Sequence, residues 1–440
     1  MRDRRGVAVA VLAALLAPLA APASGAPACV RCVTAGAAAV ELRVPEGAPL
    51  AGYGSMARRL VLPDVLGRHP HAFWFRPHEG MLDPLRVRAL VVEGGGQRLV
   101  WVAVDLIAVA RDFTERLADR LRQAGLRPAT LVVSASHTHS GPGAFLDSAV
   151  MGFIAADRED AAVRDAVVER VIEAVRAAEA RRAPARIGAA AAQAPALTKG
   201  RLGHPVDQEV VVVKVVADGG APVAVLWNFA IHGTMLGPGN LRLSADVMGA
   251  AAAAVERDLG VPALFVNGAV GDVSPRRHGA GEMGDVGQAL ARAVRAAWER
   301  ARPSAEVPLD ARQARVALPA PRLSLRNCVA RWLPAGLTLA LDSVFPGDAS
   351  LLAGRLGDVL WVTIPGELQS RLGEEVKRAA GGARAVVAGL SNDYLGYFLT
   401  SEEYDRPSYV SCASLYGPSA GERLARAAAD LVRSLVGAGR

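Results

Sequence analysis

The chain has 440 residues, of which 51% are hydrophobic and 21% charged, and its formal net charge is +7. That length and apolar content suffice for a large packed core in one large domain or two smaller ones. The positive charge is spread over scattered arginines rather than a basic stripe interleaved with aromatic residues, so we expect no nucleic-acid partner.

The first residues of the chain have the pattern of a secretory signal peptide, which we assign to residues 1–28. Three arginines precede an apolar run over residues 6–21, and Ala26-Pro27-Ala28 offers a small-x-small cleavage site. The apolar run is too short for a comfortable membrane span. We therefore expect a secreted or periplasmic protein whose mature chain, residues 29–440, forms a single domain.

Export from the cytoplasm would allow the four cysteines to form disulfides. Cys29 and Cys32 could pair near the mature terminus, and Cys328 and Cys412 could pair across the fold. Cys29 also follows the cleavage site directly, so a lipid anchor on this residue is an alternative to a soluble form.

Residues 37–54 predict an edge strand and a turn, and residues 53–81 predict a long irregular segment. Irregular segments of that length inside a domain are commonly lids or binding loops. This one carries Phe73, Trp74 and Phe75 in succession. Neighbouring side chains of an extended segment point to opposite sides, so the three cannot all face one core. Two interpretations follow: a hydrophobic plug that pins the loop, or a lid whose aromatic rim contacts a membrane surface.

Beyond this segment, apolar strands alternate with helices to the end of the chain. Strands are predicted at residues 86–92, 98–109, 129–133, 185–191, 209–216, 223–229, 263–266, 359–364 and 385–390. Helices are predicted at residues 112–124, 161–180, 245–259, 282–300, 368–379 and 421–436. The glycines at 94–96 predict a hairpin turn. The alternation predicts an α/β fold with a mixed, largely parallel sheet flanked by helices and a site at the carboxyl ends of the strands.

A pair of histidines follows the predicted strand at residues 129–133. In extended chain, side chains two residues apart share a face, so His137 and His139 can converge on one ligand or one ion. The Gly-Pro-Gly of residues 141–143 turns the backbone away directly afterwards. Two histidines on a strand are often structural, but this turn leaves the imidazoles at a strand end, where open α/β sheets bind ligands.

His232, Glu367 and Tyr397 each follow one of the later predicted strands. Histidine nitrogens and a carboxylate suit Zn²⁺, three protein ligands leave a position open for water, and a tyrosine can add a further oxygen ligand. Zinc at such a site lowers the pKa of its bound water to about 7 and polarises a carbonyl group. The second histidine of the pair would then orient a ligand or relay a proton.

At these positions the sequence resembles the neutral/alkaline non-lysosomal ceramidases, which hydrolyse the amide bond of N-acylsphingosine. The resemblance runs from residue 44 to the C-terminus and rests on six motifs in order. They are S-H-T-H-S-G-P at 136–142, N-F-A-I-H-G-T at 228–234, G-D-V-S-P at 271–275, P-G-E at 365–367, N-D-Y-L-G-Y-F-L-T-S-E-E-Y at 392–404 and Y-G-P at 416–418.

The resemblance implies one zinc ion per chain, held by His137, His232, Glu367 and Tyr397. It also implies two catalytic residues: His139, which would lie beside the zinc-bound water, and Ser274, which some accounts of the family treat as the nucleophile. A serine nucleophile needs an adjacent base, which only one of the paired histidines could supply. We therefore favour attack by zinc-bound water, with Ser274 as a hydrogen-bond donor to the substrate or the oxyanion.

These inferences predict a zinc-dependent amidohydrolase that cleaves the N-acyl amide of ceramide or a similar lipid-like substrate. Two departures from the ceramidase pattern stand out: residues 244–249 read S-A-D-V-M-G in place of S-G-D-N-K-G, and residues 198–201 read T-K-G-R in place of an N-R-S element. The sequence alone does not say which basic residue faces the substrate. The chain also stops soon after the last motif, so we expect no C-terminal β-sandwich.

Two alternatives to a ceramidase activity remain open from the sequence. The same site could serve a zinc esterase or amidase for another acylated metabolite. The chain could also be a catalytically silent lipid-binding protein of the cell envelope.

Overall fold

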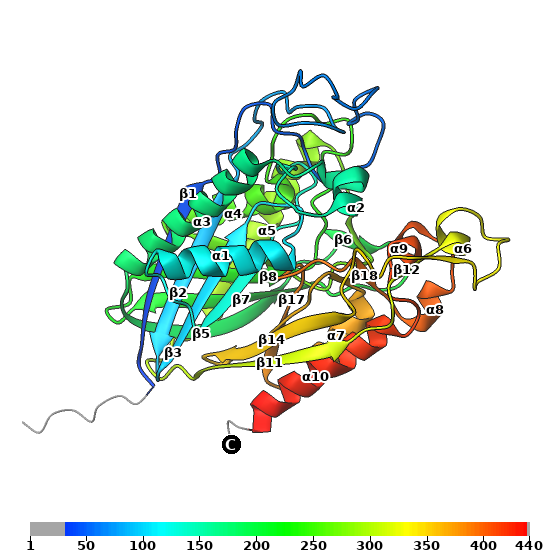
Figure 1. Ribbon diagram of the computed structural model, residues 1–440. Coiled ribbons are helices and arrows are strands. Elements are labelled where there is room, and N and C mark those ends of the chain that lie inside the picture. Colours follow the sequence, from blue (N-terminus) through cyan, green and yellow to red (C-terminus); the bar gives the residue numbers. More distant parts are fainter. Residues whose placement is uncertain (1–30, 438–440) are drawn as a thin grey trace, which may run out of the picture.

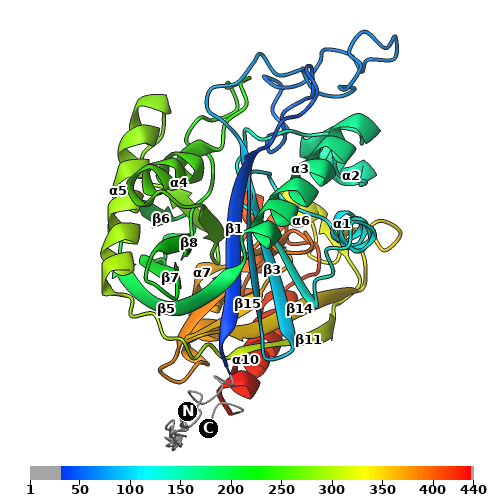
Figure 2. The same ribbon diagram turned by 90° about the vertical axis from the view of Figure 1, so that its left-hand side faces the viewer.

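The computed structural model describes residues 31–437. Two sheets pack face to face, and helices cover the outer face of each, which gives four layers (Figures 1 and 2). The predicted signal peptide and Cys29 lie outside the described residues. Among residues 31–437, no helix is both long enough and apolar enough to cross a membrane.

The larger sheet has eight strands. From edge to edge they are β4 (Thr130–Ala135), β3 (Gln97–Val104), β2 (Arg86–Gly94), β1 (Val33–Glu41), β5 (Ala183–Gln193), β7 (Glu209–Ala217), β8 (Pro222–Phe229) and β9 (Ala263–Asn267). The two outermost pairings, β3 with β4 and β8 with β9, are parallel. The five pairings between them are antiparallel.

The prediction of a largely parallel sheet is therefore wrong, although the mixed α/β class is confirmed. Strands such as β2 are buried on both faces, so their sequences read as the continuous apolar runs usual in parallel sheets. The connection from β2 to β3 is nevertheless short: Gly95 and Gly96 turn β2 into β3 with positive φ angles, as the predicted hairpin requires. Antiparallel neighbours joined in this way need no crossover helix.

The second sheet and its associated ribbons are built from the remaining strands. The four-stranded sheet runs in the order β11 (Leu309–Ala317), β14 (Asp348–Leu356), β15 (Val359–Thr363) and β17 (Arg384–Ala388), and only β15 and β17 pair in parallel. Three two-stranded ribbons are β6 (Thr198–Gly200) with β10 (Val273–Pro275), β12 (Arg322–Ser324) with β13 (Thr338–Ala340), and β16 (Glu367–Leu368) with β18 (Tyr397–Phe398). Strands β11 and β14 were not predicted from the sequence.

The helices form the two outer layers and several short connections. The longer ones are α1 (Arg111–Gln123), α3 (Ala161–Ala180), α4 (Asp246–Leu259), α5 (Ala280–Arg300), α7 (Ser370–Arg378) and α10 (Ala420–Gly437). The short ones are α2 (Ala149–Met151), a π-helical turn η1 (Gly152–Ala156), α6 (Leu325–Cys328), α8 (Ser401–Tyr404) and α9 (Tyr409–Cys412). Helices α1, α3, α4 and α5 cover the larger sheet, and α7 and α10 cover the smaller one.

Alternation along the strands divides the side chains between two buried layers. In β2, Val87 and Val91 face the helices, while Leu90 and Val92 face the second sheet. Trp101 of β3 and Trp361 of β15 meet across the interface between the sheets, with ring centroids 5.3 Å apart. The second sheet therefore explains why the larger sheet is apolar on both faces.

The larger sheet is so strongly curled that its two edge strands, β4 and β9, are in contact. The segment 389–392 after β17 bonds to both edges. Gly389 N–H donates to Asn267 O at 2.9 Å, and Ala135 N–H donates to Leu390 O at 3.1 Å. The carboxyl ends of β4, β8 and β17 consequently meet in one region.

Residues 53–81 contain turns and isolated bridges rather than regular elements, which confirms the predicted irregular segment. Its aromatic triplet is held by Asp157, a fully buried residue that follows η1. The Asp157 carboxylate accepts hydrogen bonds of 3.0–3.2 Å from the backbone N–H groups of Phe73, Trp74 and Phe75. A buried carboxylate with three amide donors fixes the backbone of this loop.

The side chains of the triplet favour the plug interpretation. Phe75 is fully buried, whereas Phe73 and Trp74 are half-buried. Trp74 packs edge-on against Phe153, with ring centroids 5.2 Å apart. The exposed apolar side chains of the segment lie earlier in the chain, at Met56, Val61, Leu62, Val65 and Leu66.

The predicted pairing of Cys328 with Cys412 is confirmed, because the two residues form a disulfide. The other predicted pairing involves Cys29, which lies outside the described residues.

Replacing Asp157 should release the aromatic loop. Asp157→Ala leaves three amide donors without their charged acceptor, and we expect a loss of about 3 kcal/mol in the local opening free energy. Hydrogen exchange of residues 60–76 should accelerate, while Asp147→Ala, at a nearby exposed aspartate, should leave it unchanged. Unaltered exchange in Asp157→Ala would show that other contacts hold the loop.

Candidate metal centre

His137 and His139 converge, but not by the strand geometry expected from the sequence. Strand β4 ends at Ala135, and His137 has a φ angle of +69°, which is outside extended structure. The pair therefore sits in a turn beyond the strand. Its ring centroids are 4.9 Å apart, so the expected convergence is confirmed and the reason given for it is wrong.

Backbone hydrogen bonds join this turn to the segment that carries His232. His139 N–H donates to Gly233 O at 3.0 Å, and Gly233 N–H donates to His137 O at 3.3 Å. A Cβ atom at position 233 would lie 2.6 Å from His137 O, so only glycine fits. The Asn267 side chain bridges the same segments, donating to Ser136 O and to Ile231 O.

Backbone carbonyls set the tautomers of two of the histidines. His137 Nδ1 lies 2.7 Å from Ile107 O, and His232 Nδ1 lies 2.7 Å from Val273 O. A carbonyl can only accept, so Nδ1 carries the proton in each ring and the Nε2 lone pair is free. Because Val273 belongs to the G-D-V-S-P motif, one role of that motif is to orient His232.

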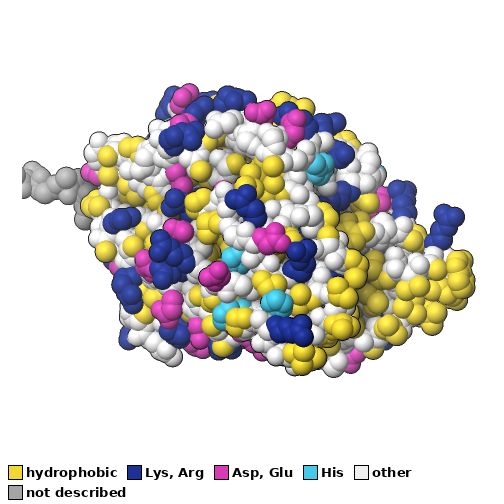
Figure 3. Space-filling view, turned by 90° about the horizontal axis from the view of Figure 1, so that it is seen from above, with side chains coloured by type: hydrophobic (Ala, Val, Ile, Leu, Met, Phe, Trp, Pro, Cys, Tyr) yellow, Lys and Arg dark blue, Asp and Glu magenta, His cyan; other side chains and the backbone are white. Residues whose placement is uncertain are grey.

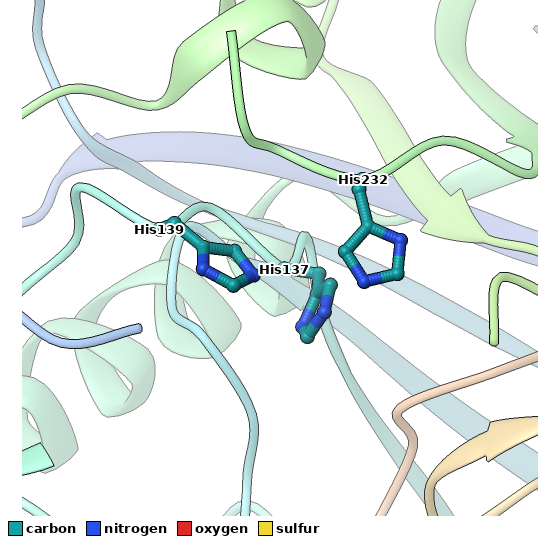
Figure 4. A group of neighbouring side chains, drawn as sticks. All are labelled: His137, His139 and His232. Atoms are coloured by element: carbon teal, nitrogen blue, oxygen red, sulfur yellow. The ribbon is translucent and has the colours of Figure 1, made fainter. Parts of the chain in front are cut away.

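Together His137, His139 and His232 form a buried group whose ligand atoms lie within 4.8 Å of one another, and Figure 4 shows the three imidazoles turned toward a common space. His137 Nε2 and both ring nitrogens of His139 are buried without a hydrogen-bond partner among the described residues. Unpartnered buried nitrogens are costly unless something coordinates them. This donor set fits a borderline divalent cation.

Glu367, in the β16–β18 ribbon that follows strand β15 of the second sheet, lies in the same cluster. Its Oε2 lies 3.0 Å from His232 Nε2, and its Oε1 lies 3.5 Å from His137 Nε2. The hydroxyl of Tyr394 donates to Glu367 Oε1 at 2.7 Å. Tyr394 was not among the predicted site residues, although it lies inside the motif at 392–404.

Tyr397 and Ser274 line the other side of the cluster. Tyr397 is the direct neighbour of Glu367 in the β16–β18 ribbon, and its hydroxyl lies 3.4 Å from His232 Nε2. Arg201 reaches both residues, donating to Ser274 Oγ at 2.6 Å and to the Tyr397 hydroxyl at 3.4 Å. Of the two basic residues at 198–201, Arg201 is therefore the one beside the cluster, whereas Lys199 is exposed.

His139 is held by packing against its ring and by a hydrogen bond to its backbone carbonyl, not by hydrogen bonds to its ring nitrogens. The ring packs against Tyr53, with centroids 4.7 Å apart, and against Gly52. Buried Arg58 donates to His139 O at 2.6 Å and lies over the Tyr53 ring. The start of the irregular segment therefore sets the position of this imidazole.

Burial controls the protonation of the site. It lowers the pKa of His232 to about 3 and holds the pKa of His139 well below its ordinary value, so both rings are neutral at neutral pH. The Tyr394 hydroxyl donates to the Glu367 carboxylate, and a hydrogen bond to the charged form favours that form. Burial and the nearby Glu367 raise the pKa of Tyr397 well above the ordinary value. Neutral imidazoles and a carboxylate are the forms that bind metal ions.

Fold and site together define an α/β sandwich with a buried histidine centre able to hold a metal ion. Residues 76–291 match the sequence model of the family described as neutral/alkaline non-lysosomal ceramidase, N-terminal. Through this domain the chain belongs to the neutral/alkaline ceramidase family. The matched region includes the three histidines and Ser274, whereas Glu367 and Tyr397 lie beyond it.

Curated relatives are similar over part of their length. The chain is 28% identical over 205 residues to the neutral ceramidase of Oryza sativa subsp. japonica, which covers 40% of this chain and 25% of that protein. It is 27% identical over 216 residues to neutral ceramidase 2 of Arabidopsis thaliana, which covers 44% of this chain and 27% of that protein. The similarity thus spans about a quarter of each plant relative.

Two solved structures share the fold over nearly the whole chain. The neutral ceramidase from Pseudomonas aeruginosa superposes with a TM-score of 0.77 at 20% identity, covering 92% of this chain and 75% of that one. A structure described as ceramidase complexed with C2 superposes with a TM-score of 0.76, also at 20% identity, covering 93% of this chain and 75% of that one.

Metal analysis tests the centre directly. If the histidines hold a divalent cation, the purified protein should contain about one per chain, as a closed site with several protein ligands implies. His137→Ala and His232→Ala should each lower the metal content strongly. The matched control is His278→Ala, at an exposed histidine outside the cluster. Metal retained in both cluster variants would mean that the cation is bound elsewhere.

Proposed function

We propose that this protein is a zinc-dependent amidohydrolase that cleaves the N-acyl amide of ceramide or a similar lipid-like substrate. The observation that carries the proposal is the buried cluster of His137, His139 and His232, whose free nitrogens converge beside the Glu367 carboxylate. Membership of the ceramidase family supports the reaction class. The solved homologue described as complexed with C2 supports a lipid-like substrate.

The proposed zinc ligands are His137, His232, Glu367 and Tyr397, with one zinc ion per chain. Two free Nε2 lone pairs, a carboxylate and a phenol oxygen within a few ångströms of each other are consistent with that set. A bound Zn²⁺ would supply Lewis acidity, polarising the amide carbonyl and lowering the pKa of a water molecule.

Ser274 serves in this proposal as a hydrogen-bond donor rather than a nucleophile. Its Oγ already accepts a hydrogen bond from Arg201 Nε, and a guanidinium has no lone pair with which to remove a proton. The serine hydrogen is then free to point toward the developing oxyanion, which Arg201 also stabilises by its charge. A nucleophilic serine would instead need a basic neighbour.

His139 is the proposed proton carrier. Its neutral ring has two nitrogens without partners among the described residues, so one can take a proton from the attacking water and later deliver it to the leaving amine. The packing of Tyr53 and Gly52 against the ring holds it in place for this transfer.

His139→Ala separates a proton carrier from a metal ligand. We expect this variant to keep its zinc and to lose about 10²–10⁴-fold in turnover, the usual effect of removing a proton-transfer group. Metal content and turnover should be measured on the same preparation. Loss of zinc would make His139 a ligand instead. A covalent acyl group on Ser274 of the parent protein, detected by mass spectrometry, would contradict the hydrogen-bonding role of that serine.

A substrate panel tests the function itself. N-acyl sphingosines of increasing chain length should be hydrolysed by the zinc-loaded protein, and the matching O-acyl esters and simple N-acyl amines serve as comparisons. Preference for the sphingosine amides supports a ceramidase. Equal or better cleavage of the comparison substrates would indicate an esterase or amidase for another acylated metabolite. Binding without turnover by any zinc-loaded preparation would indicate a lipid-binding protein.

We also propose a cellular setting from the sequence. The signal peptide pattern at residues 1–28 supports secretion or a periplasmic location, where the protein would meet lipid substrates. Contact with a membrane surface through the segment 53–81 is part of the proposal, and its exposed side chains at Val61, Leu62 and Val65 are consistent with it.

A further inference from the structure

An arm formed by residues 322–345 projects from the body of the protein. Strands β12 and β13 form a two-stranded ribbon, α6 follows β12, and the loop between α6 and β13 forms the tip (Figure 1). Its large apolar side chains are exposed to an unusual degree: Val329 71%, Trp332 80%, Leu337 44%, Leu339 53% and Val344 42%. Figure 3 shows hydrophobic side chains gathered on this projecting part at the right of the view. Contiguous exposed apolar surface of this kind usually marks an interaction site.

The composition of the arm separates it from an ordinary surface loop. Between residues 329 and 344 the charged side chains are Arg331 and Asp342 alone. Over the whole arm, three arginines (322, 326 and 331) stand against one aspartate. The arm is therefore apolar with a positive bias, which complements an anionic surface.

The arm is anchored firmly at its base. Cys328 at the end of α6 is disulfide-bonded to Cys412 of α9. The Asn327 side chain donates to Tyr404 O at 2.9 Å, and Phe345 at the far end of the arm is buried. The exposed tip is thus presented on a fixed support.

That support lies next to the metal centre. Helix α9, which holds the disulfide, begins at Tyr409, and the ring of Tyr409 lies 6.0 Å from the ring of Tyr397. Anything bound by the arm would consequently be held close to the proposed site of hydrolysis.

We propose that the arm inserts into an anionic lipid bilayer and holds the protein on the membrane surface beside the metal centre. A protein partner would cover one face of the β12–β13 ribbon, whereas the exposed side chains are spread over the ribbon and the segments on either side of β13, as immersion in lipid requires. A tryptophan at the tip with neighbouring arginines matches the interfacial region of a bilayer, where indole rings and cationic side chains gather. Binding of the arm to vesicles does not depend on the proposed function. Faster hydrolysis of membrane-bound substrate as a result of that binding does rest on the proposed function.

Vesicle flotation with the full chain tests the insertion. We expect binding to vesicles of phosphatidylcholine and phosphatidylglycerol in equal parts, and weaker binding to phosphatidylcholine alone. The double variant Val329→Ser/Trp332→Ser should bind the mixed vesicles about tenfold or more weakly, because two large apolar side chains no longer leave water. Arg326→Gln/Arg331→Gln should weaken binding to the mixed vesicles about fivefold per charge, with little effect on phosphatidylcholine.

The comparison variant is Val61→Ser/Leu62→Ser, which makes the same type of change on the segment 53–81. Its binding should exceed that of Val329→Ser/Trp332→Ser. Unchanged vesicle binding by a folded Val329→Ser/Trp332→Ser protein would overturn the proposal. So would sedimentation showing that the parent self-associates through the arm without binding vesicles, since the occupant would then be a second copy of the chain.

Hydrolysis separates the failure of this proposal from the failure of the proposed function. A short-chain, water-soluble N-acyl substrate should be cleaved equally by the parent and by Val329→Ser/Trp332→Ser, whereas a long-chain substrate in mixed vesicles should be cleaved more slowly by the variant. Equal rates on both substrates would overturn the role of the arm. Absence of cleavage of the soluble substrate by the parent would count against the proposed function and leave the vesicle result standing.

Discussion

The metal centre depends on backbone hydrogen bonds between two segments: the one after β4, which carries His137 and His139, and the one after β8, which carries His232. These strands belong to opposite halves of the larger sheet, with β9 at one edge and β4 at the other. Only a strongly curled sheet brings them together, and the hydrogen bonds between Gly233 and the paired histidines lock that closure. Any side chain at position 233 would clash with His137 O. The contact between the two segments, and with it the distance between the imidazoles, therefore requires glycine at this position.

The buried charge of the site is only partly compensated by hydrogen bonds from the protein. Glu367 is 1% exposed and lies between His137 and His232, and the hydroxyl of Tyr394 is its one strong donor. Removing a carboxylate and several imidazoles from water costs several kcal/mol unless partners replace the lost hydration. Because a bound cation would supply that partner, metal binding and the stability of this region are expected to be coupled.

The sequence predicted local features well and long-range geometry poorly. The helix at 161–180 matches α3 residue for residue, because a continuous Ala/Val/Arg/Glu pattern defines it without tertiary help. The parallel direction predicted for the central strand pairs was wrong, because strands buried on both faces have similar apolar sequences in parallel and antiparallel sheets. Strand β11 was missed because arginines and polar residues interrupt its apolar positions. The sequence could not separate Arg201 from Lys199: Lys199 is paired with Ser274 across the β6–β10 ribbon, but Arg201, the residue after β6, is the one that donates to Ser274 Oγ.

The side chains of the candidate centre come from segments that follow strands of both sheets. The family match at residues 76–291 covers only those that follow the larger sheet. The histidines follow strands of the larger sheet, whereas Glu367 and Tyr397 follow β15 and β17 of the smaller one. The distance between the histidines and the carboxylate is therefore set by the packing between the sheets, where Trp101 meets Trp361. A close-packed interface transmits small displacements. Residues far from the centre thus influence its geometry through this packing, and a match limited to residues 76–291 describes one half of a site that the second sheet completes.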